Sequence, residues 1–215
     1  MKKQILLLFL LYSIVAFSQK KEMVDNFWKG NYDKTIEIGK QILQSEPNDF
    51  ETILLIARAE DEKGNFKNAI PYLESAKKMM SEDWQKSWAF IELAKNSFGT
   101  GKLDDAKLFY NEALKVKGTK NSEKELKKFG MLTGLDEYYK NWKIRETQNI
   151  IFHFENSINE NEIERITKTR QIAFEQINVF FNSKLPKKID FFVWNLNESY
   201  NQILNTNLGF SNPVF

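Results

Sequence analysis

A glycine that recurs at nearly constant spacing organises the first half of the chain. Gly30, Gly64 and Gly101 lie 34 and then 37 residues apart. A repeat of this length is the size of two helices joined by a turn. Because glycine adopts the positive φ that such a turn favours, the spacing predicts three stacked helical hairpins. We therefore expect this half of the chain to be mainly α.

Small residues recur around the glycines at helical spacing. Two of the three copies carry alanines seven residues before, five after and twelve after the glycine: Ala57, Ala69 and Ala76, and then Ala94, Ala106 and Ala113. Seven residues are about two helical turns, so the last two alanines of each copy lie on one stripe. Such stripes allow close approach of a second helix. The pattern predicts tight packing within each hairpin.

The N-terminus has the features of an export signal over residues 1–18. Lys2 and Lys3 precede an apolar run from Ile5 to Phe17, and Ala16-Phe17-Ser18 resembles a cleavage site. We expect cleavage after Ser18 and an exported protein, periplasmic or secreted, without a transmembrane span after cleavage. The run of about 13 residues is shorter than the roughly 20 that cross a bilayer. Retention of this segment as an anchor is the alternative.

Composition excludes several classes of function. The chain has 31 basic and 29 acidic residues, and removal of Lys2 and Lys3 leaves 29 of each. Without a basic excess, nucleic acid is not an expected partner. The chain has no cysteine, which excludes disulfides, thiolate metal sites and a cysteine nucleophile.

The repeated glycines and alanines resemble the tetratricopeptide repeat, which has small residues at similar offsets. The resemblance divides residues 19–118 into three repeats: 20–48, 50–83 and 84–118. The first copy departs from the pattern, with Thr35, Gly39 and Ile42 where alanine, an aromatic residue and alanine are usual. We interpret it as a capping repeat. Residues 119–142 are expected to form capping or linker helices, broken at Gly130 and Gly134.

The resemblance implies a concave face that binds a protein or peptide. The residues it places on this face as partner-binding candidates are Leu54, Arg58, Trp88, Ile91, Lys95 and Phe98. The alternative is that Trp88 and Phe98 only pack against neighbouring helices. Leu55 and Glu92 stand where relatives that clamp a C-terminal carboxylate have cations, so the resemblance does not imply that clamp. Asp61 also maps to this face, although it and Glu62 read as an acidic pair on a solvated helix surface.

Residues 143–215 have a different pattern, which predicts an α/β segment in the order strand, helix, strand, helix. The expected elements are a strand over 144–155, a helix over 159–182, a strand over 188–194 and a short helix over 197–205. Two strands joined by a crossover helix are expected to pair in parallel. A sheet of two strands is marginal, so we expect the segment to be incomplete.

The segment from Trp142 to Phe215 resembles the opening of a peptidase MA-like zinc metallopeptidase domain. That family places a His-Glu-x-x-His helix after such a segment, and zinc catalysis needs two histidines one helical turn apart. The chain has one histidine, His153, which we expect to be a structural strand residue. No catalytic residue, metal site or cofactor is therefore predicted, and the chain as given is not expected to be an enzyme.

These observations lead to two hypotheses. The first is an exported tetratricopeptide-like protein that binds a protein or peptide in the groove of its repeats. The alternative is the N-terminal fragment of an exported zinc metallopeptidase whose catalytic motif lies beyond Phe215.

Overall fold

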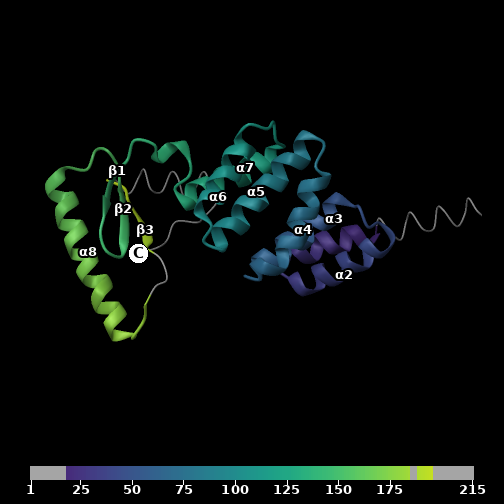
Figure 1. The fold of residues 1–215 in the computed structure, drawn as a ribbon, viewed down its shortest axis with the longest axis horizontal. Coiled ribbons are helices and arrows are strands. Elements are labelled where there is room, and N and C mark those ends of the chain that lie inside the picture. Colours follow the sequence, from purple (N-terminus) through teal and green to yellow (C-terminus); the bar gives the residue numbers. More distant parts are fainter. Residues whose placement is uncertain (1–17, 185–187, 196–215) are drawn as a thin grey trace, which may run out of the picture. The chain divides into compact units, whose positions relative to one another are not determined.

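The structure, a computed structural model, describes residues 18–184 and 188–195 (Figure 1). The chain divides into two compact units, Met1–Leu126 and Lys127–Phe215. We call them the helical unit and the sheet unit. The described part is mainly α, with antiparallel-packed helices followed by a small mixed sheet. The predicted export signal over 1–18 lies, except for Ser18, outside the described residues.

The helical unit is built from pairs of helices. The helices, in order, are residues 18–28, α2 (Tyr32–Ser45), α3 (Phe50–Glu62), α4 (Phe66–Met79), α5 (Asp83–Gly99), α6 (Leu103–Leu114) and the start of α7 (Lys120–Thr133). Within the pairs, α3 packs on α4 and α5 packs on α6, while α3 also contacts α2 and α5. The predicted arrangement of stacked helix pairs is confirmed.

The three repeated glycines make the same turn. Gly30, Gly64 and Gly101 have φ values of 76°, 76° and 77°. In each turn the amide after the glycine donates to a carbonyl five residues earlier, at 2.8–2.9 Å, as Asn31 does to Asn26. This is the bond that closes a helix with a left-handed glycine. The prediction of a positive-φ turn at each glycine is confirmed.

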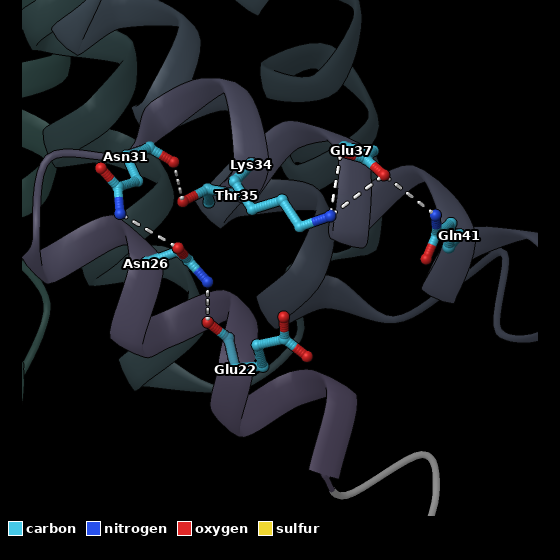
Figure 2. A network of polar contacts seen from close by, with 7 residues as sticks. All are labelled: Glu22, Asn26, Asn31, Lys34, Thr35, Glu37 and Gln41. Atoms are coloured by element: carbon cyan, nitrogen blue, oxygen red, sulfur yellow. Dashed lines mark hydrogen bonds and ion pairs between the residues drawn. The ribbon is translucent and has the colours of Figure 1, made fainter.

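Side chains reinforce the first of these turns (Figure 2). The Asn31 side-chain amide donates to the Asn26 side chain at 3.2 Å, and the Asn26 amide donates to the Glu22 carbonyl at 2.9 Å. On α2, the Thr35 hydroxyl donates to the Asn31 carbonyl at 3.1 Å. These bonds link the last turn of one helix to the first turn of the next.

The alanine stripes lie in the core, as predicted. All six alanines are at most 1% exposed. In the first helix pair, Gly39 of α2 allows the same close approach of neighbouring helices. A Cβ added there would lie 2.6 Å from Ile56 Cγ1 and 2.7 Å from Met23 Cε. The departure of the first copy from the repeat pattern therefore has a packing reason, which is a still closer approach of helices.

The sheet unit contains β1 (Lys143–Glu146), β2 (Ile150–Phe154), α8 (Glu160–Phe180) and β3 (Ile189–Val193). The strand order is β1-β2-β3, with β1 antiparallel and β3 parallel to β2. The parallel pair joined by α8 is confirmed. The single strand expected over 144–155 is wrong, because a turn closed by the Thr147 amide and the Ile150 carbonyl at 2.9 Å folds it into a hairpin. The helix expected over 197–205 lies outside the described residues.

One face of the sheet packs against α8. Ile150, Phe152 and Phe154 alternate on this face and form a core with Ile163 of α8. The apolar side predicted for α8 is only partly covered, since Phe180 is 81% exposed. The reason is length: 21 helical residues span about 31 Å, whereas a five-residue strand spans about 17 Å. The end of α8 therefore extends past the strands (Figure 1).

The other face of the sheet carries an aromatic cluster. Phe192 contacts Tyr139 at 4.8 Å between ring centroids, and Trp142 and Trp194 lie beside them. Gly134, with φ 75°, sits against the Phe192 ring.

The break expected at Gly130 is wrong, because α7 continues through it to Thr133. No helix among residues 18–184 and 188–195 combines the length and the apolar character that a membrane crossing needs.

Candidate binding groove

A groove of about 400 Å³ lies on the helical unit and is lined by the first helix of each pair. We call it the aromatic groove. Its residues are Val24, Phe27 and Trp28 from helix 18–28, Phe50, Glu51, Leu54, Leu55 and Arg58 from α3, Trp84 and Trp88 from α5, and Asn121 from α7. This is the face on which the sequence placed its candidate residues.

Five of the eleven residues that line the groove are aromatic. Trp28 is 74% exposed, although its ring meets Phe27 edge-on at 5.5 Å between centroids. Trp84 packs edge-on against Phe50 at 5.4 Å, and its indole N–H donates to Glu82 at 2.7 Å. The wall therefore combines rings fixed by their neighbours with one largely exposed ring.

Arg58 lies between two rings of the groove. Its guanidinium carbon is 4.9 Å from the centroid of Phe27 and 4.8 Å from that of Trp88. A cation over an aromatic face is attracted by the ring quadrupole. Because the side chain of Arg58 is only 15% exposed, this attraction acts in a partly desolvated setting. The two rings and Glu92 therefore restrict the position of the guanidinium.

Beneath the groove, a buried carboxylate binds two cations. Glu92 is fully buried, with its Oε1 2.9 Å from Arg58 Nε and its Oε2 3.4 Å from Lys95 Nζ. Neither contact has the geometry of a hydrogen bond. Lys95 also lies 3.2 Å from Glu125. Burial works against the charge of Lys95, but Glu92 and Glu125 outweigh it and raise the pKa of the ammonium.

The acidic pair at the end of α3 is less solvated than expected. The Asp61 Oδ2 atom is buried, and Oδ1 accepts a hydrogen bond from Asn96 at 2.7 Å. Burial raises the pKa of Asp61 to about 7, against the lowering effect of Asn96 and with a further rise from Glu92. The expectation of a solvated surface is wrong for Asp61, because α5 covers this end of α3.

The structure separates the six predicted binding residues into two groups. Leu54, Arg58 and Trp88 line the aromatic groove. Lys95 lies below it in the charge network, and Ile91 is fully buried between helices. Phe98, one turn further along α5, is half-buried and is not part of the groove lining.

Several groove residues were missed by the sequence reasoning. Val24, Phe27 and Trp28 have spacings of three and four on one helix, and Trp84 stands four residues before Trp88. Residues at these spacings share a helix face. The spacing that identifies these residues was therefore present in the sequence, but candidate residues were taken from the second and third repeats only.

A second hollow, of about 450 Å³, surrounds the turn at Gly64. It is lined by Gly64–Asn68 and by Thr100. Apart from Phe66, no large apolar side chain lines it, so it offers less surface to anchor a ligand than the aromatic groove.

His153 has a structural setting in the sheet unit. Its Nε2 is 2.7 Å from Asp190 Oδ1, and its ring stacks on Phe192 at 4.4 Å between centroids. In the described ranges, no three His, Cys, Asp or Glu side chains are grouped so as to hold a metal ion.

No model of a known protein family matches the chain, and no curated protein matches it significantly.

Proposed function

We propose that this protein binds a protein or peptide partner through the aromatic groove. The observation that carries the proposal is the exposure of Trp28 beside Trp84, Trp88 and Arg58 in a single hollow. Tryptophan and arginine are the residue types that most often dominate the energy of protein interfaces. An exposed indole that adjoins other aromatic and apolar side chains in one hollow favours a surface that a partner covers.

We propose further that the helical unit is a tetratricopeptide-like array and that the protein is exported. The shared geometry of the three glycine turns and the buried alanine stripes support a tetratricopeptide-like array. The residues of segment 1–18 support export to the periplasm or the exterior. Both features suit a binding module outside the cytoplasm. We propose no catalytic role for the described residues.

The second candidate is a module at the front of an exported zinc metallopeptidase. The parallel pair of β2 and β3 with α8 between them supports it, because it is the strand-helix-strand order on which that resemblance rests. On this proposal the aromatic groove would hold a protein substrate or an accessory partner.

A capture experiment tests the proposed groove. The tagged full chain, with the variants Trp28→Ala and Trp88→Ala, is used to recover partners from an envelope fraction of the source cells. We expect both variants to recover less of any specific partner, with unchanged helical circular dichroism. Leu108→Ala, on an exposed position of α6, is the matched control and is expected to bind normally. Equal recovery by all four proteins would overturn the groove assignment.

A further inference from the structure

We propose that the aromatic groove binds a protein segment through a side-chain carboxylate, which pairs with the guanidinium of Arg58 between Phe27 and Trp88. This inference rests on the proposed function and adds the chemistry of the partner. It follows from the donors that Arg58 leaves unused, from the single carboxylate that lies against Arg58 and from the composition of the groove wall.

Arg58 has donors to offer a ligand. Its guanidinium carries five N–H groups, of which the one on Nε lies on the Glu92 side. Among the described residues, its terminal Nη1 and Nη2 groups have no hydrogen-bond partner. Since the guanidinium is planar, the terminal groups form a fork on the side away from Nε. Arg58 itself lines the groove, so a ligand there meets this fork.

Two aromatic rings lie close to the guanidinium that carries this fork. The guanidinium carbon is 4.9 Å from the Phe27 centroid and 4.8 Å from the Trp88 centroid. A carboxylate that approaches in the plane of the guanidinium makes two parallel hydrogen bonds. Because contacts with the two rings and with Glu92 already restrict the Arg58 side chain, binding requires less further ordering of it.

The ion pairs beneath the groove place only one carboxylate against Arg58. Glu92 lies against both Arg58 and Lys95, whereas the two further carboxylates of the network, Glu62 and Glu125, lie against Lys95 at 3.7 and 3.2 Å. In the part of the chain that the structure describes, Arg58 has no carboxylate partner other than Glu92. Glu51 lines the same groove seven residues before Arg58, about 10 Å away along α3. A ligand carboxylate is therefore attracted at the Arg58 end and repelled at the Glu51 end.

The groove wall defines the residues next to that carboxylate. Leu54, Leu55 and the indoles of Trp84 and Trp88 present mainly apolar surface around the fork. The groove is lined by four alternate helices, 18–28, α3, α5 and α7, so it suits a segment laid across them rather than a chain end in a closed pocket. The partner we infer is an Asp or Glu side chain flanked by apolar residues within a protein segment.

Capped peptides test this inference on the full chain. Isothermal titration calorimetry compares two N-acetylated and C-amidated peptides, Leu-Phe-Asp-Leu-Phe and the same peptide with Asn in place of Asp. We expect the Asp peptide to bind about tenfold more tightly or better, because hydrogen bonds to charged groups are stronger than those between neutral groups. Glu51→Gln removes the carboxylate that repels the ligand, so it should enlarge that preference.

Variants of Arg58 identify the receiving group. Arg58→Gln should abolish the preference for Asp over Asn. The single variant leaves Glu92 buried without one of its cations and can therefore destabilise the fold. The double variant Arg58→Gln/Glu92→Gln removes both charges and avoids this loss. Circular dichroism confirms the helical fold of each protein before titration. A preference for Asp that survives in the double variant would overturn the role of Arg58.

The other outcomes separate this inference from the proposed function. Equal binding of the Asp and Asn peptides would overturn the carboxylate and leave the groove as a binding site. A third peptide, with Asn and a free C-terminus, overturns the side-chain assignment if it alone binds tightly. Failure of all three peptides also overturns this inference, whereas the proposed function is then decided by the capture experiment with Trp28→Ala.

Discussion

The helical unit and the sheet unit differ in the use of small residues in their interiors: alanines lie among the large apolar side chains of the helical unit, whereas the core of the sheet unit is made of isoleucines and phenylalanines. In the helical unit, alanines such as Ala76 and Ala106 lie where helices meet, and the helices approach closely around them. In the sheet unit, Phe152 and Phe154 fill the space between β2 and α8. The alanine positions of the helical unit are therefore most sensitive to added volume, and the phenylalanine positions of the sheet unit to lost volume.

Phe152→Ala should destabilise the sheet unit most. The ring is fully buried and stacks on Phe154 at 5.8 Å between centroids. Its removal should lower the free energy of unfolding by about 3–5 kcal/mol. Hydrogen exchange read by mass spectrometry should show loss of protection in β2 and β3. Phe180→Ala, at a position 81% exposed, is the control and should change little. Equal effects of the two would contradict the predicted core.

Ala76→Leu should destabilise the helical unit by overpacking. Ala76 is fully buried on the alanine stripe of α4, so three added carbon atoms have no space. We expect a loss of about 1–3 kcal/mol in the free energy of unfolding, measured by chemical denaturation. Lys78→Leu adds apolar volume to an exposed position on the same helix. A similar loss in both variants would mean that volume is not the cause.

Asp61 should make the helical unit less stable as the pH rises from about 4 to 7. Burial raises the pKa of this carboxyl to about 7 from 3.8, so between these values the folded chain holds a proton that the unfolded chain has lost. Stability contributed by that proton is present below pH 4 and lost by pH 7. Asp61→Asn should remove about 1–2 kcal/mol of this pH dependence after allowance for solvent screening. An unchanged dependence in the variant would exclude Asp61 as its source.

Two glycines should respond differently to alanine. Gly64 has φ 76° with no atom within 4 Å of an added Cβ, so Gly64→Ala should cost only the left-handed strain of about 1 kcal/mol. At Gly134 the added Cβ would also lie 2.6 Å from Phe192 Cζ. Gly134→Ala should therefore cost more, as measured by thermal unfolding. If Gly64→Ala cost as much, the turn itself would be the shared cause.

Local and periodic features were predictable from the sequence. The glycine turns and alanine stripes depend on residues a few positions apart, and their spacing identifies them. The pairing of Arg58 with Glu92 was not predicted, because it joins side chains 34 positions apart on different helices. In the sequence, Glu92 was noted only because it stands where relatives with a carboxylate clamp have a cation. In the structure, its carboxylate lies against two cations, Arg58 and Lys95.

The sheet unit was harder to predict for a different reason. The turn after β1 contains Thr147, Gln148 and Asn149, without the glycine or proline that marks most hairpins, so two strands read as one. The apolar residues of α8 were recognised, but periodicity does not say how far the sheet beside them extends.

The shared turn at Gly30, Gly64 and Gly101 makes the helical unit modular in length. Each glycine joins the two helices of one pair in the same geometry, so the pair is the unit by which such an array would be lengthened or shortened. Because the first helix of every pair faces the groove, each added pair would lengthen it by one interhelical spacing, about 10 Å. The length of the bound segment that the groove can accommodate therefore increases with the number of glycine turns.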